Sequence, residues 1–469
     1  MYNIKENLNY ENVVSKINNI FNNLEKTIRL DIFNKTKINT RINKISFIEA
    51  MIYKFKYASI NETKQNITNE YNFNNNTSIV RSSFYEKERK ISISIYKNIF
   101  FKLSSLYKQL VNNITTIIAV DGTYNNTKVF NKKGILETNL NLGFYDVEND
   151  IPFDLKFEGF EKKNKELECL KHYILNNNFD KNVIFVLDRA YCSYEFVDFL
   201  NKNNLKFVIR FRNNCKNFNK IKSIKNVRII KYIDYYNQVV INKNLTNLHD
   251  GKQYNNVTLK NKYEYTLLTN LNIKIHNDVG IKNIYKQRWS VEIFFKILKK
   301  NFNFEHLNEH NKQQSNDAYI KHNIITIICL LLEKIIEKTH YYNNNIENKI
   351  KDLEIKNKNN PIKYELRSNK SQIIKGVFRI IDNIIKGQLN TKLFSTTCNC
   401  YVSYSKVILG LSNIRIAITP FLKWYVKGYT NNSDIYKILE ALINKDPSNL
   451  NKNLKMKYKN IEIIKYNYI

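Results

Sequence analysis

The sequence lacks the paired cysteines that build structural zinc sites. Its six cysteines are scattered, with no CxxC pair among them, at Cys169, Cys192, Cys215, Cys329, Cys398 and Cys400. Structural zinc sites of the common kinds need such closely spaced pairs. We therefore expect reduced, mostly buried thiols.

Long apolar runs are also missing. The longest, near residues 324–332, is far too short to cross a bilayer. The first residues, MYNIKENLNYENVV, lack the apolar core of an export signal. The sequence therefore predicts no membrane association, and we expect an intracellular protein.

Acidic residues are scarce beside basic ones. Lys and Arg total 75 against 42 Asp and Glu, which gives a formal net charge of +33. Because 43% of the 469 residues are hydrophobic, the chain can still bury a sizeable core and is not a disordered polyelectrolyte. The positive charge indicates a polyanionic partner such as nucleic acid.

The patterns along the chain predict three regions. Residues 1–105 hold basic helical segments broken by Asn-rich turns, which fit a helix-turn-helix-like DNA-binding region or, equally, a plain helical bundle with a basic exterior. Residues 106–340 alternate strand and helix patterns, with a basic, β-rich insertion at 213–264. Residues 341–469 are rich in Lys and Asn, with helical patches of no identified role.

The middle region predicts a mixed α/β sheet with helices on its faces. Its order is strand, hairpin, helix, strand, helix, strand, with the hairpin turning at 148–150. The first strand, 114–120, is a β-branched run that stops at Asp121-Gly122. A second apolar strand, in NVIFVLDRAY, stops at Asp188. We expect each strand to deliver a carboxylate at its C-terminal end.

Residues 284–300 predict a helix that is apolar except for one polar stripe. At about 100° per residue, five polar side chains share this stripe: Tyr285, Arg288, Glu292, Lys296 and Lys299. A helix apolar on most sides is largely buried, so its stripe faces either solvent or a functional site.

Asp121, Asp188 and Glu292 form an oxygen-ligand cluster if the fold brings them together. Such clusters suit Mg²⁺ or Mn²⁺. Two ions about 3.5–4 Å apart clamp the attacking and leaving oxygens of a phosphoryl transfer. Each residue also has a simpler explanation: Asp121 before glycine is a common turn, Asp188 could cap the next helix, and Glu292 could be a solvated carboxylate.

These residues resemble the motifs of DDE-type transposases of the insertion-sequence-4 family, whose catalytic domain has a ribonuclease-H-like fold. The family signature Y-x2-R-x3-E-x6-K is matched, with every spacing kept, by Tyr285, Arg288, Glu292 and Lys299. The segments IIAVDGT and LDRAY are similar to its two aspartate motifs and stand in the expected order. The resemblance covers about residues 20–335 and leaves out the tail.

The resemblance implies a DNA transposase that cleaves the ends of a mobile element by metal-dependent hydrolysis and joins the 3′-hydroxyl ends to target DNA. It implies two Mg²⁺ or Mn²⁺ ions per active site, with Asp121 bridging both while Asp188 and Glu292 each complete one. The partners would be terminal inverted repeats and target DNA, held by a homodimer. The expected DNA contacts are Tyr285, Arg288 and Lys299, with further candidates in Arg189, Arg210 and Arg212. For the last three, salt bridges at the edge of the core are an equal alternative.

Two features depart from that family. Asp121 is followed by Gly122, where many relatives carry a hydroxyl residue. Some relatives form a DNA hairpin and stack a flipped base on a Trp of the insertion. The insertion of this sequence has no Trp, because the two tryptophans of the chain are Trp289 and Trp424. Tyr232, Tyr235, Tyr236 or Tyr254 of the insertion could stack on the base instead, so the sequence does not decide whether a DNA hairpin forms.

Two other functions fit parts of the sequence. A catalytically inactive or repurposed transposase-derived protein would bind DNA without cutting it. His306, Glu309 and His310 match the H-x-x-E-H pattern of some zinc peptidases, although no third ligand is evident.

Overall fold

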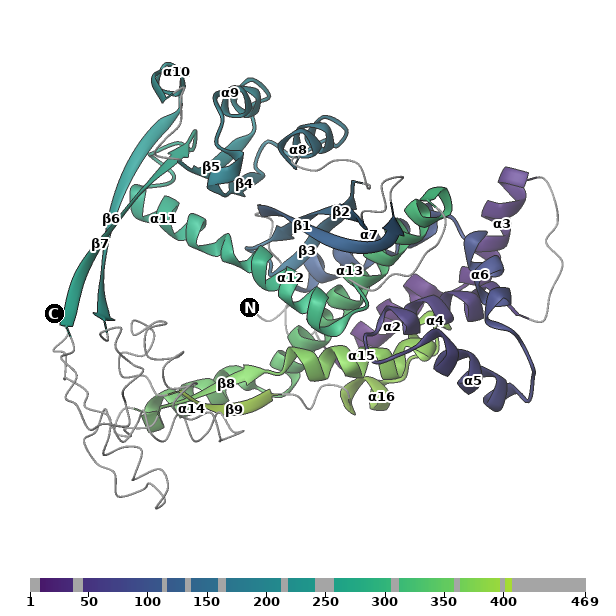
Figure 1. Cartoon of the computed structure of the whole chain (residues 1–469). Coiled ribbons are helices and arrows are strands. Elements are labelled where there is room, and N and C mark those ends of the chain that lie inside the picture. Colours follow the sequence, from purple (N-terminus) through teal and green to yellow (C-terminus); the bar gives the residue numbers. More distant parts are fainter. Residues whose placement is uncertain are drawn as a thin grey trace, which may run out of the picture. The chain divides into compact units, whose positions relative to one another are not determined.

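The structure is a computed structural model of the 469-residue chain. It describes residues 9–36, 45–111, 116–130, 136–158, 166–211, 218–240, 257–304, 312–357, 363–396 and 401–406. The chain divides into two compact units (Figure 1). The first unit consists of Met1–Ile230, Thr266–Glu347 and Ser368–Tyr401, and the second of Lys231–Tyr265, Asn348–Arg367 and Val402–Ile469.

The N-terminal part of the first unit is helical, as its sequence patterns predict. Its helices are α2 (Tyr10–Phe21), α3 (Leu24–Thr36), α4 (Phe47–Ala58), α5 (Lys64–Asn75), α6 (Arg81–Arg89) and α7 (Ile93–Val111). Helix α4 begins at a capping box in which Ser46 and Glu49 satisfy each other's backbone N–H groups. The rings of Tyr53 on α4 and Phe84 on α6 stack with centroids 4.5 Å apart. Whether this region binds DNA stays a prediction.

A mixed sheet follows, with seven strands in the order β3-β2-β1-β4-β5-β7-β6. The strands are β1 (Ile117–Phe130), β2 (Leu136–Asp146), β3 (Ile151–Phe157), β4 (Ile184–Leu187), β5 (Lys206–Arg210), β6 (Arg228–Val240) and β7 (Val257–Thr269). Strands β1, β2 and β3 form an antiparallel meander, β4 and β5 run parallel to β1, and β7 pairs antiparallel with β5. This arrangement confirms the mixed α/β sheet expected from the sequence.

Strand β1 is longer than the sequence predicts. It continues through Asp121 and Gly122 because these residues pair with Gly143 and Leu142 of β2. The expectation that the strand ends at Asp121 is therefore wrong. The parallel pairing with β4, however, ends at Ala119. Asp121 therefore still comes just beyond the last parallel pair.

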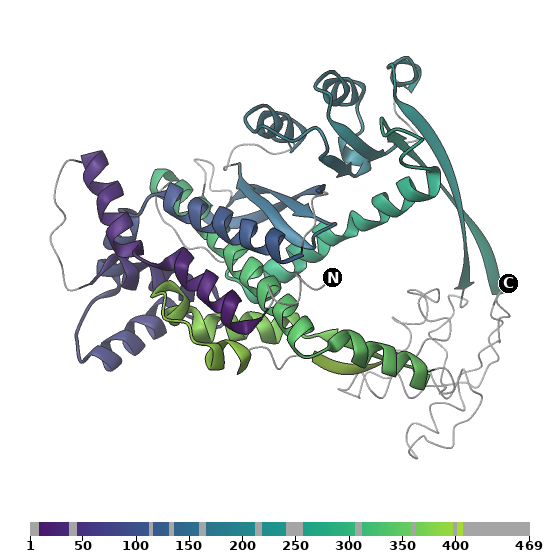
Figure 2. The same ribbon diagram turned by 180° about the vertical axis from the view of Figure 1, so that it is seen from behind.

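Helices cover both faces of the sheet (Figures 1 and 2). The helices that follow the meander are α8 (Glu166–Leu175), the short 3₁₀ helix η1 (Arg189–Tyr191), α9 (Tyr194–Lys202), α11 (Asp278–Gln287), α12 (Trp289–Asn301) and α13 (Lys312–Asn343). Phe144 of β2 stacks on Tyr173 of α8, with ring centroids 4.0 Å apart. The next residue, Tyr145, lies 5.4 Å from Phe294 of α12 by the same measure. Because successive strand residues point to opposite faces, α8 and α12 cover opposite faces.

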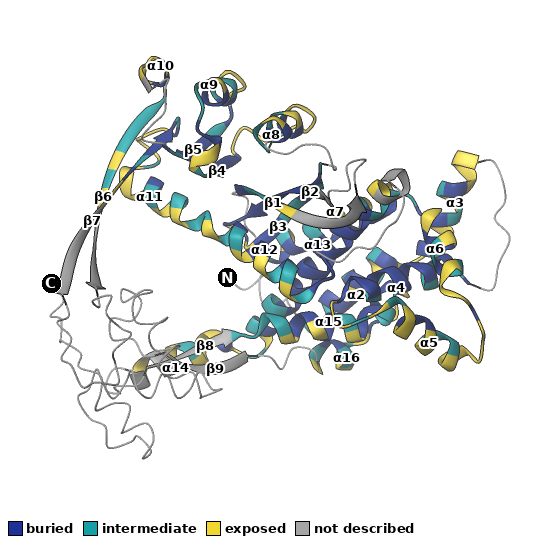
Figure 3. Ribbon diagram, viewed as in Figure 1, coloured by how far each residue is buried: buried dark blue, intermediate teal, exposed yellow. Residues whose placement is uncertain are grey.

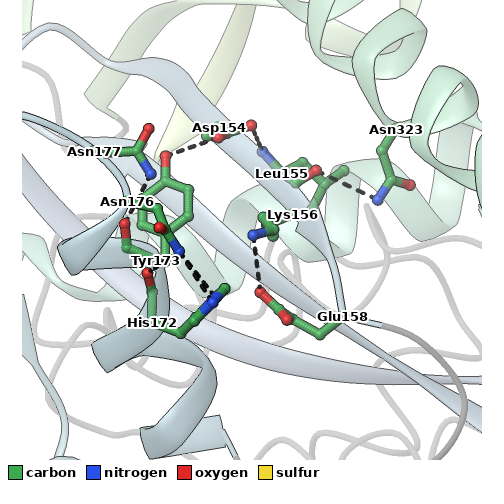
Figure 4. A network of polar contacts seen from close by, with 9 residues as sticks. All are labelled: Asp154, Leu155, Lys156, Glu158, His172, Tyr173, Asn176, Asn177 and Asn323. Carbon is green, nitrogen blue, oxygen red and sulfur yellow. Dashed lines mark hydrogen bonds and ion pairs between the residues drawn. The ribbon is translucent and has the colours of Figure 1, made fainter.

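Strand β3 holds a helix on each side (Figure 4). The Tyr173 hydroxyl of α8 donates to Asp154 Oδ2 at 2.7 Å. The Asn323 amide of α13 donates to the Leu155 carbonyl at 3.4 Å and to Asn141 Oδ1 of β2 at 2.8 Å. These polar contacts fix α8 and α13 against the sheet, and α13 confirms the long, buried helix expected there.

Helix α13 also contacts the N-terminal helices through a buried ion pair. Lys321 Nζ lies 3.2 Å from Glu88 Oε1 of α6, and both side chains are about 95% buried, with exposures of 4% and 5%. Glu88 also accepts a hydrogen bond from the Tyr96 hydroxyl of α7 at 3.1 Å. The ion pair ties these helices to the sheet domain, and the helices of this unit are buried on their inward sides (Figure 3).

The single helix expected over residues 284–300 is divided into α11 and α12 at Arg288. The backbone stays helical there, but Arg288 N donates to the Tyr285 carbonyl and Val291 N to the Arg288 carbonyl, three residues back in each case. The junction is thus a tightened turn. Only one side of α12 is buried, since Trp289 is 50% exposed and Ile293 is 41% exposed. The expectation that this helix is largely buried apart from its polar stripe is therefore wrong.

The remaining elements are α10 (Phe218–Lys222), α14 (Ile346–Asn357), β8 (Lys363–Ser368), α15 (Lys370–Ile385), α16 (Thr391–Thr396) and β9 (Tyr401–Lys406). The insertion at 213–264 is β-rich, as expected, because it holds β6 and most of β7. Strands β8 and β9 pair in a small sheet, which the expectation of a helical C-terminal region missed. Among the described residues, no helix is long and apolar enough to cross a membrane.

Candidate active site

Asp121 and Asp188 stand at corresponding points of two neighbouring parallel strands. The preceding residues, Val120 and Leu187, belong to the hydrophobic cluster under α8 and α9. Since successive strand residues point to opposite faces, Asp121 and Asp188 point away from this cluster, to the face that α12 covers. The register of β1 and β4 therefore directs both residues to the face on which Glu292 lies.

Asp121 occupies a buried and negatively charged environment. Burial raises the pKa of its carboxyl to about 7, and the negative charges of Glu166 and, more weakly, Asp188 add to this effect. The positive charge of Arg288 opposes it. The structure thus brings Asp121, Asp188 and Arg288 into one electrostatic cluster, although they are far apart in the sequence.

Asp188 also caps the short helix that follows it, as its simpler explanation proposed. Its Oδ1 accepts a hydrogen bond from the Ala190 N–H at the start of η1. One oxygen of Asp188 therefore fixes the turn, and the carboxylate still lies close enough to raise the pKa of Asp121.

Arg288 and Glu292 form an ion pair across one turn of helix. Arg288 Nη2 lies 2.6 Å from Glu292 Oε1, and the two side chains are 15% and 26% exposed. Burial lowers the pKa of Arg288. The hydrogen bond to Glu292 and the charges of Tyr285, Glu292 and Asp121 have a larger effect together, so the pKa of Arg288 is raised overall. Arg288 thus interacts with carboxylates on both β1 and α12.

Tyr285 extends the cluster towards β5. Burial raises the pKa of its hydroxyl, and the negative charge of Asp188 raises it further. The positive charges of Arg288 and Arg210, together with a hydrogen bond with Arg210, act in the opposite direction. Arg210 is therefore part of the cluster. Arg189 is exposed beside Asp188, and Lys299 lies half-buried farther along α12. Arg212 lies outside the described residues, as do the peptidase-like residues His306, Glu309 and His310.

Glu166, on the first turn of α8, is a member of this cluster that the sequence did not reveal. Its carboxylate accepts a hydrogen bond from the Tyr191 hydroxyl of η1. It also lies against Gly122, where an added Cβ would collide with Glu166 Oε1. Gly122 is therefore needed for this close approach. An acidic residue in a first helical turn is common, so local sequence gave no signal of its role.

The donor atoms of the cluster fit a hard divalent cation. Asp121, Asp188 and Glu292 offer carboxylate oxygens, the ligands that Mg²⁺ and Mn²⁺ prefer. A cation would also relieve the repulsion that raises the pKa of Asp121. In this conformation Glu292 is bound to Arg288. Within the described ranges, no three His, Cys, Asp or Glu residues are placed to hold one ion together.

The comparisons with known proteins give a family match over the middle of the chain. Residues 116–329 match the family model of the transposase DDE domain, a range that includes Asp121, Asp188 and Glu292. No curated protein matches the chain. Among solved structures, the chain is similar to the piggyBac transposase synaptic complex with hairpin DNA, at 10% sequence identity and a TM-score of 0.37, over 83% of this chain and 85% of that one. The family match supports a transposase of the DDE type, whereas the insertion-sequence-4 assignment stays a prediction.

Proposed function

We propose that this chain is a DNA transposase that binds the ends of a mobile element, cleaves them by metal-dependent hydrolysis and joins the 3′-hydroxyl ends to target DNA. The observation that carries the proposal is the convergence of Asp121, Asp188 and the Arg288–Glu292 pair within the segment that matches the transposase DDE domain. The net charge of +33 supports a DNA partner.

Asp121, Asp188 and Glu292 would hold two Mg²⁺ or Mn²⁺ ions. When bound, such ions supply Lewis-acid activation of the attacking and leaving oxygens in a phosphoryl transfer. The two aspartates come from the rigid sheet, and Glu292 comes from a helix packed on it. To bind an ion, Glu292 must at least partly release Arg288, because Arg288 Nη2 is hydrogen-bonded to Glu292 Oε1 at 2.6 Å.

The positive side chains of the cluster are suited to DNA phosphates. A planar guanidinium binds phosphate oxygens in pairs, so a phosphate can replace Glu292 as the partner of Arg288. Tyr285 and Lys299 lie on the same pair of helices, and Arg210 reaches Tyr285 from β5. We assign the binding of the phosphates beside the scissile bond to these residues, with Arg189 and Arg212 as further candidates.

The parts of the chain divide this work in the proposal. Residues 1–105 would bind the terminal inverted repeats, residues 106–340 would cut and join, and residues 341–469 have no assigned role. A homodimer would bring two ends together. These assignments follow from the resemblance of the motifs and from the basic character of the helices.

A catalytically inactive, DNA-binding protein is the second candidate. The Arg288–Glu292 ion pair favours it, because an arginine that stays on Glu292 would exclude a cation from that carboxylate. The two candidates differ in one assay, in which the full chain is incubated with Mg²⁺ and with DNA from both sides of its reading frame, where the proposal places the inverted repeats. Nicking at the repeat ends supports the transposase, and stable binding without nicking supports the inactive protein.

A further inference from the structure

Glu166 is the one carboxylate of the cluster that the transposase motifs leave without a role. It is half-buried at the start of α8, which is fixed on the sheet by the hydrogen bond from Tyr173 to Asp154. The position of Glu166 is thus set by the packing of the helix rather than by its own side chain.

Two contacts hold the Glu166 carboxylate beside the paired aspartates. Tyr191, whose hydroxyl donates a hydrogen bond to Glu166, ends the 3₁₀ turn that Asp188 caps. Gly122, which leaves room for the carboxylate, directly follows Asp121. Glu166 therefore touches the neighbour of one aspartate and the turn of the other.

This placement is electrostatically unfavourable without a cation. Glu166 lies against Gly122, next to Asp121, and is held by Tyr191 in the turn that Asp188 caps, so three carboxylates gather in a half-buried region. Groups that repel one another in a partly buried site destabilise the fold unless a positive charge compensates them. A carboxylate that served only to cap α8 could be exposed, as Glu168 is on the same turn.

We infer that Glu166 is a positioning residue of the cation site, which strengthens cation binding by Asp121 and Asp188 from the opposite side of β1. It does so by adding negative charge and by holding the Asp188 turn through Tyr191. The inference rests on the proposed function, because it needs the cation site at Asp121. Residues that orient metal ligands in this way typically change metal affinity by about 10- to 100-fold when they are removed.

Binding of Mn²⁺ to the full chain tests this role without any measurement of cleavage. The dissociation constant can be obtained from the electron paramagnetic resonance signal of free Mn²⁺. Glu166→Gln keeps the size of the side chain and an oxygen that accepts from Tyr191, but removes the charge. We expect its dissociation constant to rise about 10- to 100-fold. Glu168→Gln is the matched control and should bind Mn²⁺ as the wild type does.

A second variant moves the carboxylate without removing it. In Gly122→Ala the new Cβ would displace the Glu166 carboxylate, which is the flexible end of its side chain. The variant should therefore weaken Mn²⁺ binding as well, and it replaces Glu166→Gln if that protein does not fold.

The outcomes separate the inference from the proposed function. Weaker binding in Glu166→Gln, with Glu168→Gln unchanged, supports the role of Glu166. Wild-type affinity in Glu166→Gln, together with lost affinity in Asp121→Asn, overturns that role and leaves the cation site intact. Equal affinity in the wild type and Asp121→Asn contradicts the cation site itself.

Discussion

Replacement of Arg288 by alanine should destabilise the metal-free protein. The change removes the partner of Glu292 and a positive charge that lowers the pKa of Asp121. Fully exposed ion pairs contribute about 0.2–1 kcal/mol, whereas hydrogen bonds to charged groups contribute about 1.5–3 kcal/mol. With exposures of 15% and 26%, the pair lies between these cases. We expect the free energy of unfolding to fall by about 1–3 kcal/mol.

The assay is denaturant unfolding of the full chain with and without Mn²⁺. In Arg288→Ala the added cation should restore more stability than it adds to the wild type, because it takes over the neutralisation of Asp121 and Glu292. Lys296→Ala is the matched control, since Lys296 is an exposed cation of the same helix whose Nζ lies 5.0 Å above the Trp289 ring. Its effect should stay within about 0.5 kcal/mol.

DNA binding by the same variants gives a second readout. If Arg288 and Lys299 bind phosphates, each alanine variant should lower the slope of log affinity against log salt concentration by about one unit. Lys296→Ala should leave the slope unchanged. An Arg288→Ala protein with the stability and the salt slope of the wild type would refute this reasoning, because the arginine would then be only a surface residue.

Three further predictions concern the cation and the buried charges. Mg²⁺ and Mn²⁺ should support DNA cleavage while Ca²⁺, with its looser coordination, supports assembly only, and equal cleavage in EDTA would contradict this. Lys321→Met should lower the free energy of unfolding by about 3–5 kcal/mol because it leaves Glu88 buried without its partner, whereas an unchanged denaturation curve would show that the pair contributes nothing. Burial raises the pKa of Glu333 from 4.5 to about 8. The folded state therefore holds the Glu333 proton more tightly than the unfolded state does. The free energy of unfolding consequently falls as pH rises from 4.5 to about 8. Glu333→Gln should therefore be more stable than the wild type at pH 8 and above in pH-dependent unfolding, and a larger gain at pH 5 than at pH 8 would disprove the assignment.

The elements that local patterns define were predictable from the sequence. The apolar run before Asp188 and the helical periodicity of α8, α9 and α13 gave these elements in the right order. The spacing of Arg288 and Glu292 placed them one helical turn apart, where they do form a pair. Parallel strands then bring Asp121 and Asp188 together whenever the topology is right.

Features that depend on distant partners were not predictable. Strand β1 runs beyond Asp121 because β2 offers pairing partners that lie about 20 residues later in the chain. Glu166 joins the site only because α8 packs over Gly122, and neither residue signals this alone. The pairing of β8 with β9 joins two segments separated by two helices. Each of these depends on tertiary packing rather than on local preference.

Cleavage of a DNA end by the three carboxylate variants tests the central claim most directly. The full chain would be incubated with Mg²⁺ and with DNA from both sides of its reading frame, where the proposal places the inverted repeats, beside Asp121→Ala, Asp188→Ala and Glu292→Gln. The wild type should nick at the repeat ends, while each variant should bind the DNA nearly as well and leave both strands intact. Nicking at the wild-type rate by any one variant would remove that residue from the site, and nicking by all three would contradict the proposed active site.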